Sequence, residues 1–126
     1  MYNYKKDDSV YLLKRENGSG TFTGFEGVIK DVSRTVKGVK RFTVSYLGDN
    51  EIVFRGDQTC VKDMYVNSFY LFPSEKEADQ YLDELEKTQM MKEKIEKIIQ
   101  SKCTFEELEQ IYLFLEARYP HEMRWL

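Results

Sequence analysis

The chain has 126 residues, the usual size of one globular domain, and its hydrophobic fraction of 41% with 33% charged residues excludes a disordered chain. A formal net charge of −3 disfavours a protein that depends on a strongly basic surface. The longest strongly apolar run, 111–115, is far too short to span a bilayer, and the first residues lack an apolar signal segment. We therefore expect a cytoplasmic protein without a membrane contact.

The charge is divided unevenly along the chain. Residues 1–72 hold 11 Lys and Arg against 9 Asp and Glu, which leaves +2, whereas residues 73–126 hold 8 against 13, which leaves −5. Such an asymmetry concerns the partners of a protein rather than its fold. Neither half is extreme in its charge.

Residues 9–72 carry the pattern of a β-structure. Between residues 41 and 47 the side chains Phe42, Val44 and Tyr46 alternate with polar neighbours, which predicts a half-buried strand. Turn-forming residues separate the other apolar runs. We expect five strands, at 9–14, 21–32, 41–47, 51–55 and within 64–72. Five short strands with a long first loop predict a small SH3-like β-barrel, because closing a sheet removes its exposed edges.

A change to helical periodicity follows residue 72. Ser74 with Glu77, and Thr104 with Glu107, each have the spacing of a capping box and predict two helix starts. The short connection 100–103 should fold the helices into an antiparallel hairpin. The expected fold class is therefore α+β, with an SH3-like β-barrel over 1–72 and a C-terminal helical hairpin over 73–126 that packs on the barrel.

One run in the barrel resembles a known motif. Phe22-Thr23-Gly24-Phe25-Glu26-Gly27-Val28-Ile29 is similar to the F-x-G-x-x-G-x-V core of the KOW motif of ribosomal proteins and transcription elongation factors. The resemblance extends over about residues 21–55 and implies an SH3-like barrel that binds RNA, a ribosome or a polymerase. The overall layout also resembles small uncharacterised accessory proteins of phages and other mobile elements.

A basic hairpin at 30–41 is the candidate for contact with phosphates or with a partner. Several cations on one projecting loop could neutralise phosphates and release their counterions. The alternative is a solvated turn whose charges keep a sheet edge soluble. The hairpin cations are Lys30, Arg34, Lys37, Lys40 and Arg41.

Aromatic residues near the end of the barrel allow two interpretations. Tyr65, Phe69, Tyr70 and Phe72 could stack on nucleic-acid bases. Alternate residues of a strand must face inward, however, and this favours a role in the barrel core and in the contact with the first helix.

The second helix carries more apolar residues than one buried stripe requires. It is either a central helix in the core or an exposed face that binds a partner protein or a second copy of the chain. The narrow stripe consists of Phe105, Leu108, Tyr112 and Leu115, and Leu113 is the residue least compatible with it. The tail adds residue types that are enriched at protein-binding hot spots. The candidate protein-contact face consists of Leu113, Phe114, Arg118, Tyr119 and Trp125.

No motif of an enzyme, a cofactor site or a metal site is present in the sequence. The two cysteines, Cys60 and Cys103, are expected to be packed, reduced thiols. We expect a non-enzymatic accessory or inhibitor protein of a phage or other mobile element, which occludes a host or defence protein by binding it. A KOW-like module that binds nucleic acid or a ribonucleoprotein through the basic hairpin is the alternative, and a homodimer through the C-terminal helices is also open.

Overall fold

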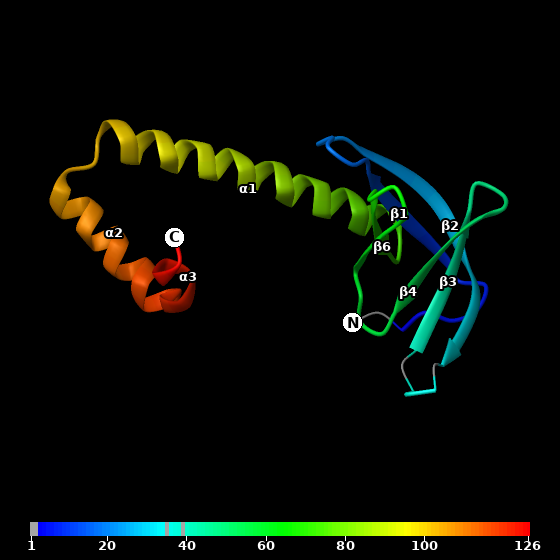
Figure 1. The fold of residues 1–126 in the computed structure, drawn as a ribbon. Coiled ribbons are helices and arrows are strands. Elements are labelled where there is room, and N and C mark those ends of the chain that lie inside the picture. Colours follow the sequence, from blue (N-terminus) through cyan, green and yellow to red (C-terminus); the bar gives the residue numbers. More distant parts are fainter. Residues whose placement is uncertain (1–2, 35, 39) are drawn as a thin grey trace. The chain divides into compact units, whose positions relative to one another are not determined.

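The computed structural model describes residues 3–34, 36–38 and 40–126, and it divides into two compact units, Met1–Leu82 and Asp83–Leu126. The first unit consists of strands followed by the start of a helix, and the second unit is helical (Figure 1). The expected α+β class is confirmed.

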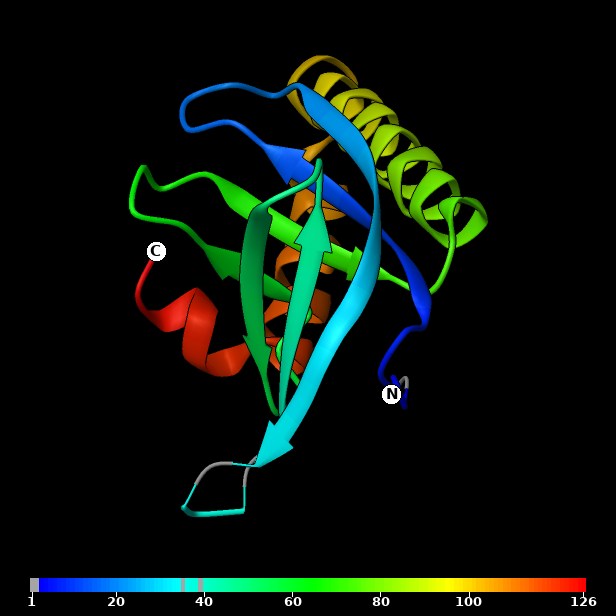
Figure 2. The same cartoon turned by 90° about the vertical axis from the view of Figure 1, so that its right-hand side faces the viewer.

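The strands form a nearly closed antiparallel barrel. Their order in the sheet is β4-β3-β2-β1-β6-β5. The long β2 curves, so that its first half pairs with β1 and its second half with β3 (Figure 2). This shared strand joins the two halves of the barrel. The strands are β1 (Ser9–Arg15), β2 (Phe22–Arg34), β3 (Lys40–Tyr46), β4 (Asn50–Arg55), β5 (Cys60–Lys62) and β6 (Ser68–Phe72).

The expected number of five strands is wrong, because β5 is a sixth strand. It has only three residues, and alternation cannot be recognised over so short a segment. The turn between β5 and β6 is held by Asp63, whose carboxylate accepts hydrogen bonds from the backbone N–H groups of Tyr65 and Asn67, both at 2.9 Å. The single strand expected within 64–72 is therefore part of a hairpin.

The barrel core is made of the inward-facing residues of the strands. Phe42 and Val44 are buried and Tyr46 is half-buried, which confirms the alternation predicted for this segment. Burial of such side chains is the main favourable term in folding. The buried cluster consists of Val10, Leu12, Ile29, Val44, Ile52, Phe54, Phe69 and Leu71.

A second apolar contact lies on the outer face of the barrel, where the chain enters its first helix. The Tyr81 ring centroid is 5.5 Å from that of Tyr70 and 5.3 Å from that of Phe72. Phe69 is buried in the core, whereas Tyr65 is 71% exposed. The predicted role in the core and in the helix contact is thus confirmed for three of these four aromatic residues.

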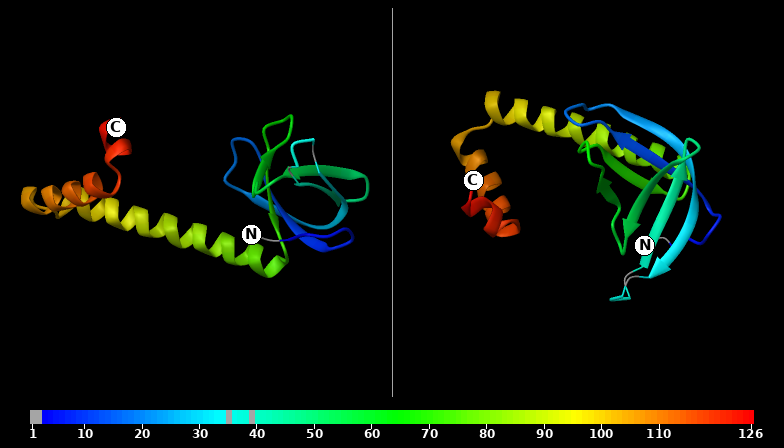
Figure 3. Two further views of the ribbon diagram at one scale, coloured as in Figure 1. Left: turned by 90° about the horizontal axis from the view of Figure 1, so that it is seen from below. Right: turned by 45° about the vertical axis from the view of Figure 1, so that its right-hand side comes forward.

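Three helices follow the barrel: α1 (Glu75–Ser101), α2 (Phe105–Arg118) and α3 (Pro120–Arg124). α1 begins directly after Ser74, as predicted. At α2 the Thr104 hydroxyl accepts from the Glu107 N–H at 3.3 Å, and the Glu107 carboxylate accepts from the Thr104 N–H at 3.1 Å, which confirms the second capping box. The chain bends sharply between α1 and α2 (Figure 3). Antiparallel packing of the helices, and packing on the barrel, stay predictions.

Replacing Thr104 with alanine should destabilise α2 by about 1 kcal/mol, because one N-terminal N–H loses its acceptor. α2 has no buried residue that could compensate for the loss. Amide hydrogen exchange over 105–118 should become faster. Ser101→Ala is the control, since the Ser101 hydroxyl bonds the Lys97 carbonyl at the end of α1. Equal exchange in α2 for both variants would contradict the role of the cap.

Candidate functional site

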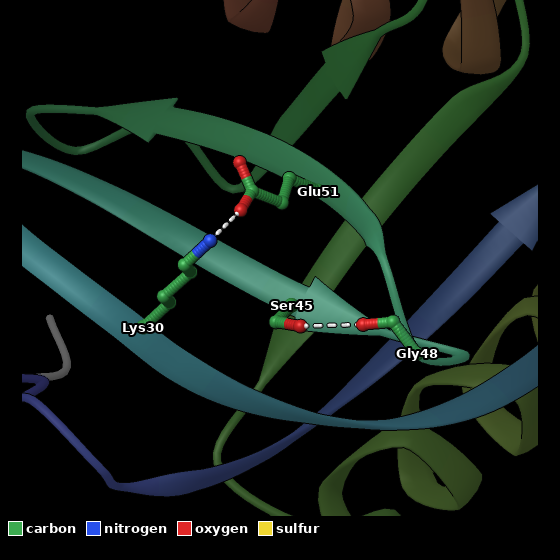
Figure 4. Close-up of polar contacts among 4 residues, drawn as sticks. All are labelled: Lys30, Ser45, Gly48 and Glu51. Atoms are coloured by element: carbon green, nitrogen blue, oxygen red, sulfur yellow. Dashed lines mark hydrogen bonds and ion pairs between the residues drawn. The ribbon is translucent and has the colours of Figure 1, made fainter.

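The first candidate surface is the basic hairpin, and part of its charge is already neutralised. Lys30 lies at a register shift in β2 and forms an ion pair with Glu51 on β4 (Figure 4). This hydrogen-bonded carboxylate raises the pKa of Lys30. In the same view the Ser45 hydroxyl donates to the Gly48 carbonyl at 3.1 Å and fixes the turn between β3 and β4. Lys30 therefore links β2 to β4 across the intervening strand β3.

Two more of the hairpin cations bond within the barrel unit. A terminal nitrogen of Arg34 donates to the Gly38 carbonyl at 3.3 Å. The Lys40 ammonium donates to the Asn3 side chain at 2.8 Å and lies 5.1 Å from the centroid of the Phe42 ring. Lys37 is exposed in the turn, and residues 35 and 39 of this hairpin lie outside the described residues. Phosphate binding by these cations stays a prediction.

The fifth hairpin cation has a neighbour that sequence reasoning missed. Arg41 on β3 lies directly opposite Arg55 on β4, and both are exposed. Directly opposed residues point to the same side of a sheet. The alternation of each strand places both arginines outward, but only the strand register shows that they are neighbours.

The second candidate surface is the helical unit, which leaves its apolar side chains open to solvent. No side chain is buried in residues 83–126, all of which the structure describes. Phe105 is 78% exposed, Phe114 68% and Leu113 49%. Exposed apolar area of this extent marks interaction sites in soluble proteins.

The position of Leu113 on α2 follows from helix geometry. Ile111 and Leu115 are half-buried and mark the side of α2 that faces the rest of its unit. Residues two apart on a helix differ by about 200° around its axis, so Leu113 points away from that side. Of the narrow stripe considered in the sequence, Leu115 is half-buried, whereas Phe105, Leu108 and Tyr112 are exposed. The role of Leu113 in a contact face stays a prediction.

The tail of the chain supplies the remaining residues of the predicted contact face. Arg118 ends α2 and is exposed, Tyr119 is 46% exposed and Trp125 is 74% exposed. The Arg124 guanidinium lies 5.9 Å from the centroid of the Trp125 ring. The five predicted residues thus all lie exposed on the helical unit, and Arg124 adds a cation beside its tryptophan.

The cysteines are free thiols and half-buried. Burial, as the larger cause, and a hydrogen bond with Cys60, as the next, raise the pKa of Tyr70 to about 12, so this phenol is neutral at physiological pH.

Within residues 3–34, 36–38 and 40–126, no group of three His, Cys, Asp or Glu side chains could hold a metal ion. None of the described helices combines the length and the apolar character that crossing a membrane requires.

The chain was compared with protein-family models, with curated proteins and with solved structures, and it matches none of them.

Proposed function

We propose that this chain is a non-enzymatic accessory or inhibitor protein that binds a partner protein and occludes its surface. The observation that carries the proposal is the helical unit 83–126, which has no buried side chain but exposes large apolar residues. Helices gain most of their stability in proteins from packing an apolar face, so this face requires a cover. Trp, Tyr and Arg near the C-terminus are the residue types most enriched at binding hot spots.

The setting of this function, in a phage or other mobile element with a host or defence protein as the target, belongs to the same proposal. It is supported by the resemblance of the overall layout, in which a small barrel precedes charged helices. Occlusion requires no catalytic group, only a complementary surface.

The test is Leu113→Asp. We expect this variant to remain folded, since Leu113 is half exposed and points away from the half-buried side of α2. A charge at a hot spot of the interface should weaken partner binding by at least about 2 kcal/mol, or about 30-fold. The measurement is affinity capture from source-cell lysate with and without nuclease, followed by titration of the captured protein.

Leu47→Asp is the matched control, because it makes the same substitution at an exposed leucine of the barrel unit, in the turn between β3 and β4 and outside the basic hairpin. It should capture the partner as the wild type does. Thermal unfolding and sedimentation of each variant separate lost binding from lost folding. An unfolded Leu113→Asp protein would show that the residue is core, and undiminished capture by a folded variant would equally refute the proposed contact face.

A further inference from the structure

A cavity on the barrel, away from the basic hairpin, combines two cations with a loop that contains glycines. Its volume is about 350 Å³, and the loop 16–20, Arg15, Lys62 and Ser68 line it. Glu16 is the one acidic residue among the described residues that line this cavity, so cations are in excess. From this arrangement we infer a binding site for a phosphate group, which is independent of the proposed helical contact surface.

The strand register places the two cations on opposite sides of one serine. Arg15 on β1 lies directly opposite Ser68 on β6, and Lys62 on β5 also lies opposite Ser68. Opposed residues in antiparallel strands share one face of the sheet. Neighbouring strands are about 4.8 Å apart, so about 10 Å separates the backbones of Arg15 and Lys62. Both long side chains can reach an anion held above the Ser68 hydroxyl.

Arg15 is oriented before any ligand binds. Its Nε donates to the Ser19 carbonyl at 3.0 Å, and its guanidinium lies 5.9 Å from the centroid of the Phe22 ring. A guanidinium that is already held by a hydrogen bond at Nε and lies against an aromatic ring loses little conformational entropy when it binds an anion. Arg15 is therefore suited to a bidentate contact with phosphate oxygens.

The loop beside Arg15 is also ordered. The Ser19 N–H donates to the Glu16 carbonyl at 3.0 Å, and the Asn17 N–H donates to the side chain of Asn67, in the turn between β5 and β6, at the same distance. Gly18 has a φ of +76°, a conformation that favours glycine, and a Cβ atom at this position would meet no atom within 4 Å. The backbone at Gly18 is thus open to an approaching ligand.

A phosphate could come from the backbone of a nucleic acid or from a small phosphorylated molecule. The test is an NMR titration of the full chain with two probes, inorganic phosphate and a short oligothymidylate. We expect the amide signals of 16–20 and 66–68 to shift with at least one probe. The double variant Arg15→Gln, Lys62→Gln should weaken that binding about tenfold or more, because a hydrogen bond to a charged group has this size.

The double variant Lys5→Gln, Lys6→Gln is the matched control, because it also removes two exposed cations from the barrel unit, outside both the cavity lining and the basic hairpin. It should leave binding at the cavity unchanged. A response to the oligothymidylate alone would identify a nucleic-acid backbone as the source, and a response to phosphate alone would identify a small ligand.

The inference is overturned if neither probe shifts these amides, or if both double variants weaken binding equally, which would indicate general attraction by positive charge. Unchanged amide signals elsewhere in the barrel establish that each variant is folded. Glutamine retains the ability to donate a hydrogen bond and part of the side-chain length, so it is the mildest removal of the charge.

Discussion

Replacing Phe69 with alanine is expected to lower the free energy of unfolding of the barrel by about 3–5 kcal/mol. Phe69 is 1% exposed, and its ring centroid is 5.7 Å from that of Tyr46. Removing the ring takes away buried apolar surface and leaves a cavity that the surrounding strands fill only in part. The total free energy of unfolding of a small domain is only about 5–15 kcal/mol, so this loss is a large fraction of the total.

Urea unfolding followed by near-ultraviolet circular dichroism, which reports on the packed tyrosines, is the measurement. Tyr65→Ala is the control from the turn that precedes the same strand, because this residue is 71% exposed and should change stability by less than about 0.5 kcal/mol. If the two variants unfolded at the same urea concentration, the assignment of Phe69 to the core would be wrong.

The parts of the fold that the sequence predicts are those with a clear local signal. The alternation at 41–47 predicts β3, and Phe42 and Val44 of its inward face are buried as expected. The Thr104 and Glu107 spacing predicts the start of α2, because a capping box needs only residues that are close in the chain. Local hydrogen bonds and local periodicity can be predicted from a single sequence.

The parts that the sequence did not predict depend on contacts between distant segments. β5 has three residues and is defined by its pairing with β6. A segment this short has no recognisable periodicity in the sequence. The cavity cations Arg15 and Lys62 belong to strands that are far apart in the chain and meet only across Ser68. Likewise, Arg41 and Arg55 become neighbours through the register of β3 and β4. Register is a three-dimensional property, and a shift by one residue would reverse every face.

The second helix shows a different limit of sequence reasoning. Its apolar residues fit either a core or a contact face, because both bury the same side chains. The structure shows that α2 has no buried residue, with Ile111 and Leu115 only half-buried. The apolar surface that remains open on α2 is the reason that the proposed function centres on this helix.

Replacing Gly27 with valine is expected to lower the free energy of unfolding by at least about 1 kcal/mol, because the site leaves no room for a branched side chain. A Cβ atom at Gly27 would lie 3.1 Å from the Ser45 carbonyl oxygen and 3.1 Å from a methyl group of Val44. Gly27 faces the barrel core between β1 and β3, with which β2 pairs at this residue. The backbone oxygen cannot move away without disturbing the pairing of β2 and β3.

Gly20→Val is the matched control for this substitution. It makes the same change in the loop before β2, where a Cβ atom would meet no atom within 4 Å. The control should change stability by less than about 0.5 kcal/mol, as is usual for exposed positions. Thermal unfolding of both variants separates the effect of close strand packing from the general effect of replacing a glycine. A melting temperature of Gly27→Val equal to that of the wild type would mean that β1, β2 and β3 do not approach as closely as the barrel requires.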